Sequence, residues 1–424
     1  MTDILDELQW RGLVAQTTDE SALRQALADG PITAYCGFDP TAPSLHFGNL
    51  VQLVVLRHLQ RAGHRVICLV GGSTGLIGDP RPTSERGLKT KEQTAEWVAR
   101  IQEQVRPFLD TSGENAAVFV NNLDWTEGMS ALDFLRDVGK HFRVNQMLRK
   151  DAIAARLASD EGISYTEFSY QLLQGLDYLE LYRQYGCTLQ TGGSDQWGNL
   201  VAGSDLIHRV EGRSVHLLTT PLLTDSSGEK FGKSAGNAIW LSADMTSPYA
   251  FYQYWLNVED ASVVTLLKVF TDRSAEEIAD LERQLADEPW KRAAQRCLAA
   301  DVTTLVHGPA ATSAVQAASE ALFGKGDLRA LDAATLRDAA SELPSGAVSV
   351  GMSVVDALVA VGLAESRNAA RRTVGEGGAS VNGVKVADPE SALGDNDVLP
   401  GGVVVLRRGR KNLAAGLVDT PSTA

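Results

Sequence analysis

Short apolar runs alternate with helical patterns along the first half of the chain. Four runs have the length and apolar content of buried strands, at residues 32–35, 64–70, 116–120 and 188–191. Between them, apolar side chains recur at helical spacing, as at Leu50, Leu53, Val54 and Leu56. Strands that alternate with helices across short connections form mostly parallel sheets with helices on both faces. The pattern therefore predicts a Rossmann-like, doubly wound α/β domain.

In the second half of the chain, the sequence pattern changes twice. Residues 247–323 follow helical patterns throughout, and residues 343–347 have the composition of a linker. Beyond them lie two short helical patterns, an Asn-Gly hairpin signal at Asn382 and an apolar run at 403–406. We therefore expect four parts: an α/β domain at 1–245, an α-helical domain at 246–340, a linker at 341–352, and a small α+β domain at 353–424 whose tail after Leu417 is disordered.

Composition narrows the class of protein. The 424 residues are 44% hydrophobic, as in ordinary globular proteins, and the acidic, amphipathic N-terminus does not resemble a signal peptide. No apolar run reaches membrane-spanning length. The four cysteines are far apart and form no Cys-x-x-Cys pair, which argues against a zinc site or a disulfide framework. We expect a cytoplasmic protein with no membrane partner and no protein-bound metal.

The net charge of −14 conceals a local basic patch. A negative charge of this size normally argues against a nucleic-acid partner. The C-terminal part nevertheless concentrates basic residues on its second helix and after its last strand, at Arg367, Arg371, Arg372, Arg407, Arg408, Arg410 and Lys411. Two such clusters in a small module are typical of a surface that binds a phosphodiester backbone.

The turn at 35–49 has the features of a nucleotide site. It joins the first apolar run to a helix that opens with His46-Phe47-Gly48-Asn49. A helix start presents unpaired backbone N–H groups and the positive end of the helix dipole, which suits a phosphate. Gly48 lets a ligand approach the backbone closely, and the side chains of His46 and Asn49 add donors. We infer that a nucleotide binds here.

Two further strand ends carry glycines and an acid. The run at 64–70 leads into a glycine-rich turn that ends at Asp79, and the run at 188–191 leads to Gly192-Gly193-Ser194-Asp195. The first turn lacks the Gly-x-Gly spacing of a dinucleotide fingerprint, so tight backbone packing explains its glycines well. Open α/β sheets bind ligands at the carboxyl ends of their strands. Asp79 and Asp195 are therefore candidate ligand contacts.

Two other patterns do not decide between alternatives. Tyr170, Gln174 and Asp177 share one helix face, and taken alone such a polar stripe fits a solvent-exposed face better than a pocket. Lys230 and Lys233 lie in a glycine-containing loop, for which a solvated charged turn is the simpler interpretation. As a phosphate clamp this loop makes sense only beside a site such as that at His46, where a lysine can follow a phosphate as it moves.

Together, these motifs resemble the class I aminoacyl-tRNA synthetases of the bacterial tyrosyl type. The residues at 46–49 resemble the first signature of that class and those at 230–234 the second, with the segment 192–196 between them. The C-terminal module resembles the small RNA-binding domain of bacterial enzymes with this specificity. Two departures are that Asn49 stands where the family usually has histidine, and that the loop after Asp79 lacks the paired lysines of many relatives, leaving Arg81 and Arg86.

The resemblance implies a role for each candidate residue. His46, Lys230 and Lys233 would be catalytic, by stabilising charge on the phosphates. Tyrosine would be bound by Tyr35, Asp79, Tyr170, Gln174, Asp177 and Gln196. ATP would be contacted by Cys36, Gly37, Asp39, His46, Gly48, Asn49, Gly193, Asp195, Lys230, Lys233 and Ser234. The basic residues of the C-terminal patch would bind tRNA. Because the implied ligand site includes the polar stripe at 170–177, the resemblance favours a pocket over a solvent-exposed face for that stripe.

The resemblance also implies a reaction and its partners. Tyrosine would attack the α-phosphate of ATP, bound with Mg²⁺, and the resulting tyrosyl-adenylate would transfer tyrosine to the 3′-terminal ribose of its tRNA. The implied partners are L-tyrosine, ATP, the tRNA for tyrosine and a second copy of the chain in a homodimer. A tryptophan-specific relative, or an RNA-binding paralogue without catalysis, is the alternative.

Overall fold

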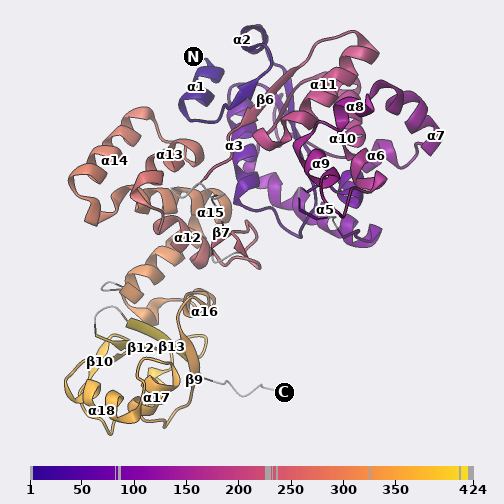
Figure 1. Ribbon diagram of the computed structural model, residues 1–424. Helices are drawn as coiled ribbons and strands as arrows, with labels where there is room; N and C mark the ends of the chain where they lie inside the picture. Colours follow the sequence, from indigo (N-terminus) through magenta and orange to yellow (C-terminus); the bar gives the residue numbers. More distant parts are fainter. Residues whose placement is uncertain are drawn as a thin grey trace. The chain divides into compact units, whose positions relative to one another are not determined.

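Figure 1 shows a computed structural model of the chain. It describes residues 3–81, 83–84, 87–224, 231, 233–234, 237–323, 326–409 and 412–418, with the side chains of all of these except 233, 234 and 237. The contacts divide the chain into two compact units, Met1–Met245 with Glu259–Ala294, and Thr246–Val258 with Gln295–Ala424. Among the described residues, no helix combines the length and the hydropathy needed to cross a bilayer.

The first unit is built on a six-stranded sheet with the order β1-β6-β5-β2-β3-β4. All neighbouring strands are parallel except β1, which runs antiparallel to β6. The strands are β1 (Gln16–Thr17), β2 (Thr33–Phe38), β3 (Arg65–Val70), β4 (Val118–Asn121), β5 (Cys187–Gly193) and β6 (His216–Thr220). The predicted doubly wound α/β fold is confirmed. Its strand order reverses between β2 and β5, the position at which such sheets bind ligands.

Helices cover this sheet, and three of them lie next to the position between β2 and β5 where the strand order reverses. α3 (Phe47–Arg61) follows β2, α10 (Tyr165–Tyr185) precedes β5, and α11 (Trp197–Glu211) follows β5. Ser164 caps the start of α10 by accepting from the backbone of Glu167, and Gly186 ends it with a positive φ of 61°. The remaining helices are α1 (Ile4–Trp10), α2 (Glu20–Ala28), α4 (Gly72–Ile77), α5 (Lys91–Val105), α6 (Leu123–Thr126), α7 (Ala131–Asp133), α8 (Val144–Met147), α9 (Asp151–Leu157), α13 (Asp260–Phe270) and α14 (Ala275–Asp287).

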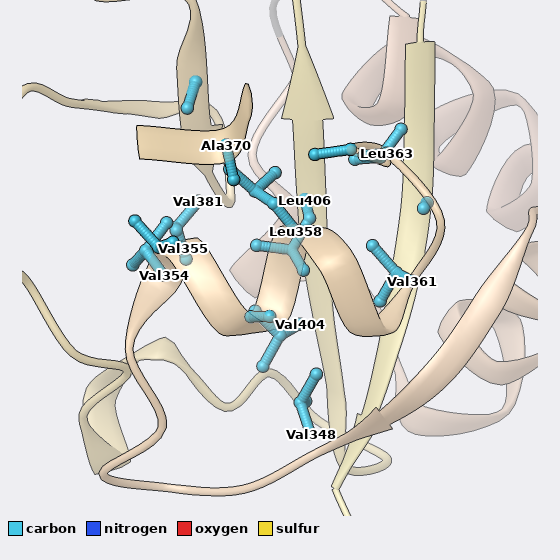
Figure 2. Close-up of a cluster of buried hydrophobic side chains, with 14 of the residues drawn as sticks. Val348, Val354, Val355, Leu358, Val361, Leu363, Ala370, Val381, Val404 and Leu406 are labelled. Atoms are coloured by element: carbon cyan, nitrogen blue, oxygen red, sulfur yellow. The ribbon is translucent and has the colours of Figure 1, made fainter. Parts of the chain in front are cut away.

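The second unit combines helices with a five-stranded sheet of order β11-β10-β12-β13-β9. Its helices are α12 (Pro248–Leu256), α15 (Ala293–Phe323), α16 (Ala333–Ser341), α17 (Val354–Ala360) and α18 (Arg367–Gly375). Its strands are β9 (Ser345–Val348), β10 (Ala379–Val381), β11 (Val384–Val386), β12 (Val403–Arg408) and β13 (Asn412–Val418). Figure 2 shows the side chains of α17 packed against Val404 and Leu406 of β12 in the core of this sheet.

The hairpin of this sheet forms where the sequence predicts it. β10 pairs with β11 antiparallel, with Val381 opposite Val384. Between them, Asn382 and Gly383 have φ angles of 49° and 82°. Two positive φ angles define the turn type that matches the twist of a two-residue hairpin, and Asn-Gly tolerates them best.

One sequence-based boundary is wrong. The segment 341–352, interpreted as a linker, contains β9, which pairs parallel with β13. A Cβ at Gly346 would lie 2.2 Å from the carbonyl oxygen of Ala360. The glycine therefore allows a strand to pass close to the end of α17, and composition alone made it resemble a flexible connection. β13 continues to Val418, and residues 419–424 of the expected disordered tail lie outside the described residues.

The helical segment is also less uniform than its pattern suggests. Within α15, Gly308 has φ 83° and ψ 166°, and Pro309 follows, so two helices meet at a kink. By contacts, α13 and α14 group with the first unit, whereas α12 and most of α15 group with the second. The division into domains at 245 and 340 otherwise stays a prediction.

Candidate active site

A cavity of about 450 Å³ lies at the carboxyl ends of β2 and β5. All six predicted tyrosine contacts line it, namely Tyr35, Asp79, Tyr170, Gln174, Asp177 and Gln196. The predicted ATP contacts that line it are Cys36, Gly37, Asp39, His46, Gly48, Asn49, Gly193 and Asp195. Lys230 lies outside the described residues, as do the side chains of Lys233 and Ser234. Residues as far apart in the sequence as Tyr35 and Gln196, 161 positions, thus share one cavity.

Asp177 is the most deeply buried acid of this cavity, with an exposed fraction of 1%. Asn122 Nδ2 and Trp125 Nε1 donate hydrogen bonds to its two carboxylate oxygens, each over 3.0 Å. Burial raises the pKa of Asp177 to about 8, although these two hydrogen bonds oppose the shift. The side chain is therefore held in one orientation at the bottom of the cavity.

Three polar atoms around Asp177 are buried without a hydrogen-bond partner among the described residues. They are the Tyr35 hydroxyl and the side-chain carbonyl oxygens of Gln174 and Gln190, and all three residues line the cavity. Burial raises the pKa of the Tyr35 hydroxyl, and the neighbouring Asp177 adds to the shift, so the group stays a neutral donor. Because buried polar groups are normally satisfied, their concentration here indicates a polar ligand.

Two further acids, Asp79 and Asp39, line the cavity and are more exposed than Asp177. Asp79 accepts hydrogen bonds from Lys150 Nζ (2.9 Å) and Gln196 Nε2 (3.1 Å). Asp39 accepts from the Tyr170 hydroxyl and from Thr74 Oγ1, each over 2.7 Å. Tyr170 and Asp79 line the same cavity, and the Tyr170 hydroxyl donates to Asp39. Both acids place negative charge where an ammonium group could bind.

The start of α3 forms the nucleotide side of the cavity. His46 is the N-cap, and its Nδ1 accepts from the backbone N–H of Gly48 over 3.0 Å. Asn49 Oδ1 in turn accepts from the backbone N–H of His46 over 3.1 Å, which completes a capping box. Because Nδ1 is an acceptor, the neutral ring carries its hydrogen on Nε2 and can donate it to a phosphate oxygen. Asn49 thus has a local role in fixing His46.

The segment around the second lysine motif is anchored beside this helix start. The backbone N–H of Phe47 donates to the carbonyl of Ile239 over 2.9 Å, and His46 forms an isolated β-bridge with Trp240. The rings of Phe47 and Phe231 are 5.3 Å apart, edge to face. Phe231 stands between the two predicted lysines in the sequence. Phe231, Ile239 and Trp240, which flank the second lysine motif in the sequence, therefore contact the start of α3.

The remaining predicted ATP contacts lie along β2 and the end of β5. Cys36 Sγ contacts Gln52 Oε1 at 3.8 Å, and burial raises the pKa of the Cys36 thiol to about 12, so the thiol is uncharged. A Cβ at Gly193 would lie 2.7 Å from Asp195 Oδ1, which explains a glycine beside that carboxylate. Asp195 thus lies beside the carboxyl end of β5, where open α/β sheets bind ligands.

Sequence reasoning missed several residues that hold the candidate site in place. Asn122 and Trp125 follow β4 directly, so the rule that ligands bind at strand ends could have suggested them. The strand-end rule does not single out Lys150 or Asn199. Lys150 lies in an irregular segment between α8 and α9, and Asn199 lies within α11. Only long-range contacts reveal that Lys150 reaches Asp79.

Four of the described basic residues of the C-terminal patch have partners within their own unit. Arg367 pairs with Asp356 over 2.8 Å and Arg371 with Glu390 over 2.9 Å. Arg408 donates to the carbonyl of Leu363 over 2.9 Å, and Arg407 donates to the carbonyl of Leu322 at the end of α15. Arg372 is exposed on α18, and Arg410 and Lys411 lie outside the described residues. The patch is thus partly neutralised by its own module.

Comparison with known families agrees with this geometry. Residues 27–324 match the family described as "tRNA synthetases class I (W and Y)". Residues 335–415 match the "Tyrosine--tRNA ligase SYY-like C-terminal domain". The chain belongs to the tryptophan and tyrosine group of class I tRNA synthetases. The family expected from the sequence motifs is confirmed.

Individual members of this synthetase group resemble most of the chain. A tyrosine–tRNA ligase of Streptomyces coelicolor is 62% identical over 416 residues, which cover 98% of this chain and 99% of the relative. One of Leifsonia xyli subsp. xyli is 62% identical over 418 residues, covering 98% and 94%. The crystal structure of a C-terminally truncated mitochondrial tyrosyl-tRNA synthetase of Coccidioides posadasii has a TM-score of 0.66 at 32% identity and covers 74% of this chain and 91% of that one.

Proposed function

We propose that the chain is a tyrosine–tRNA ligase. It joins L-tyrosine to ATP, releasing pyrophosphate, and transfers the tyrosyl group from the adenylate to the 3′-terminal ribose of the tRNA for tyrosine. The observation that carries the proposal is the fixed, buried carboxyl of Asp177 beside the unpartnered hydroxyl of Tyr35, at the bottom of a cavity that also contains the start of α3. Ligases with this activity are 62% identical over nearly the full chain.

The bottom of the cavity selects the phenol. The substrate hydroxyl can exchange hydrogen bonds with Tyr35 and Asp177. Phenylalanine would leave the Tyr35 hydroxyl buried without a partner, and Asp177 with only the hydrogen bonds from Asn122 and Trp125. Tyrosyl-tRNA synthetases are themselves the standard example of this effect, and the discrimination on the order of 10⁵ belongs to that class of enzymes. Asp79, together with the Tyr170–Asp39 pair and Gln174, holds the α-ammonium group, which orients the amino-acid carboxylate toward the nucleotide side.

Adenylate formation requires positioning and charge stabilisation more than proton transfer. The tyrosine carboxylate is already a nucleophile at neutral pH and attacks the α-phosphorus as pyrophosphate leaves. Nε2–H of His46 and the N-terminal amides of α3 donate to the phosphates, and Lys230 and Lys233 add positive charge. ATP enters as its Mg²⁺ complex. Cys36, Gly193 and Asp195 contact the ribose.

The C-terminal unit supplies the tRNA contacts. Arg367, Arg371 and Arg372 on α18, Arg407 and Arg408 at the end of β12, and the Arg410 and Lys411 that follow in the sequence attract the phosphodiester backbone. We also propose a cytoplasmic homodimer. Large apolar side chains are exposed in one stretch of the first unit, at Leu132, Leu135, Val144, Leu148 and Leu157. Such a concentration on one segment is typical of a surface that a second copy covers.

The proposal is tested by ATP–pyrophosphate exchange with tyrosine, tryptophan, phenylalanine or no amino acid. Exchange that depends on tyrosine alone supports it. Exchange that depends on tryptophan would instead identify the tryptophan-specific activity of the same group. The absence of exchange with every amino acid, from a folded protein, would leave an RNA-binding protein without catalysis.

A further inference from the structure

Four side chains form a closed hydrogen-bonded network behind the candidate ammonium site. Lys150 Nζ lies 2.9 Å from Asp79 Oδ1 and 2.8 Å from Asn199 Oδ1. Asn199 Nδ2 donates to Gln196 Oε1 over 2.8 Å and to Asp79 Oδ1 over 3.3 Å. Gln196 Nε2 donates to Asp79 Oδ2 over 3.1 Å. Each member therefore fixes the orientation of the next, and both oxygens of Asp79 are held.

Lys150 approaches Asp79 from a cavity other than the one that would hold the substrate. Asp79 and Gln196 line the 450 Å³ cavity that contains Tyr35 and Asp177. Lys150 lines a neighbouring cavity of about 350 Å³, together with Trp197 and Gly198. Asp79 and Lys150 thus belong to the wall between the two cavities. An ammonium group can approach Asp79 from the first cavity while Lys150 stays bound from the second.

The Lys150–Asp79 ion pair is largely shielded from solvent. The side chains of Lys150 and Asp79 are 13% and 18% exposed, and Asn199 is fully buried. Shielded charges interact more strongly than pairs at the open surface, where the contribution is small. Removal of Lys150 would take the cation from Asp79 and the donor from the buried Asn199 carbonyl. The amides of Asn199 and Gln196 could then rotate, and Asp79 would lose its fixed direction.

We propose that Lys150 is a positioning residue for the α-ammonium of the amino acid, which acts by holding Asp79 in a fixed orientation. This inference rests on the proposed function, because it requires an amino-acid substrate at Asp79. Lys150 itself does not touch the substrate. Supporting groups of this kind determine how well a directly binding residue is preorganised.

The first test separates tyrosine binding from ATP binding in Lys150→Met. We expect the KM for tyrosine in ATP–pyrophosphate exchange to rise about 10-fold, with the KM for ATP changed less than 2-fold. Lys150→Arg, which keeps the charge, should recover at least part of the loss. Arg149→Met removes an adjacent, exposed cation that lines the same neighbouring cavity, and it should leave the KM for tyrosine unchanged. An unchanged or lower KM in Lys150→Met overturns the proposal.

The second test asks whether the effect passes through Asp79. Lys150→Met should weaken tyrosine binding in the wild-type background and cause no further loss in the Asp79→Asn background. Losses that simply add in the double variant would overturn the proposal, since a general structural role predicts additivity. The affinity for 3-(4-hydroxyphenyl)propionate, which lacks the ammonium, should be the same in wild type and Lys150→Met. An equal loss for this ligand and for tyrosine would also overturn it.

These outcomes are distinct from a failure of the proposed function. If wild type shows no tyrosine-dependent exchange, the proposed function itself is wrong. If wild type is active and Lys150→Met has the wild-type KM, only the role of Lys150 is wrong. Should Lys150→Met fold poorly, Lys150→Gln keeps a hydrogen-bond donor of similar length without the charge, and the same 10-fold rise is expected.

Discussion

The two halves of the active-site cavity are built by different means. At the amino-acid end, side chains from β2 and α10 are fixed by hydrogen bonds from neighbouring side chains, as Asn122 and Trp125 fix Asp177. At the nucleotide end, the donors are the first backbone amides of α3 and the His46 ring that caps them. Selection of one amino acid requires a rigid polar pocket, whereas phosphate binding requires positive charge and N–H groups in one direction.

The comparison predicts its largest effect at Asp177. Asp177→Ala should lower kcat/KM for tyrosine in the exchange reaction by at least about 10³-fold, because the phenol and Tyr35 both lose a buried partner. ATP affinity, measured by calorimetry, should stay within a factor of 3. Asp124→Ala, at an exposed aspartate next to Trp125, serves as the matched control and should be fully active. Parallel losses of tyrosine and ATP binding would contradict the division into two halves.

At the nucleotide end, the change that tests the comparison is His46→Ala. Loss of one preorganised donor to developing phosphate charge should lower kcat by roughly 10²–10³-fold. The affinity for tyrosine should hardly change, because His46 contacts the other half of the cavity. The measurement is single-turnover adenylate formation, and His208→Ala, at an exposed histidine on α11, is the control. A rise in the Kd for tyrosine as large as the loss in rate would argue against separate roles.

The burial of Asp177 should also be visible in stability. Burial raises the pKa of Asp177 from 3.8 to about 8 in the folded chain. Between these values the folded state retains a proton that the unfolded state releases. The free energy of unfolding therefore falls with rising pH, by up to about 1.4 kcal/mol per pH unit from this group. Asp177→Asn has no such proton, so its stability relative to wild type should increase between pH 5 and pH 8 in denaturant titrations.

A constant difference in stability between Asp177→Asn and wild type across this pH range would show that Asp177 is ionised in the folded chain. In that case the ionised carboxylate of Asp177, and not the protonated acid, would form the hydrogen bond with the substrate phenol. The test is best done without substrate, because a bound phenol adds a partner to the same group.

The smallest expected effect lies in the second unit. Arg372→Ala removes an exposed charge from α18 and should raise the KM for tRNA in aminoacylation about 2- to 5-fold, with a weaker salt dependence. Exchange without tRNA should be unchanged, which separates this residue from both halves of the cavity. Equal effects on exchange and on aminoacylation would indicate a loss of folding and not of tRNA contact.

Local signals explain what could be predicted from the sequence. The capped helix start at His46 and the hairpin at Asn382 depend on neighbouring residues, so their patterns were sufficient. The parallel sheet followed from alternating periodicities. β9 was interpreted as part of a linker because it contains Gly346, and glycine is typical of loops. In the structure this glycine instead allows the strand to pass close to the end of α17.

The network at Lys150 could not be predicted, since its members are separated by up to 120 residues in the sequence and come from different elements and connections of the fold. For the same reason the sequence did not reveal that the Tyr170 hydroxyl donates to Asp39. Side chains on one helix face can be grouped from the sequence, but their partners on other elements depend on the fold.

The central claim is that buried hydrogen-bonding groups which only a phenol can satisfy determine the choice of substrate. It is tested most directly by the ratio of kcat/KM for tyrosine to that for phenylalanine in wild type and in Tyr35→Phe. Removal of the unpartnered hydroxyl should lower this ratio about 5- to 150-fold, equivalent to about 1–3 kcal/mol. The same ratio in both proteins would contradict the account.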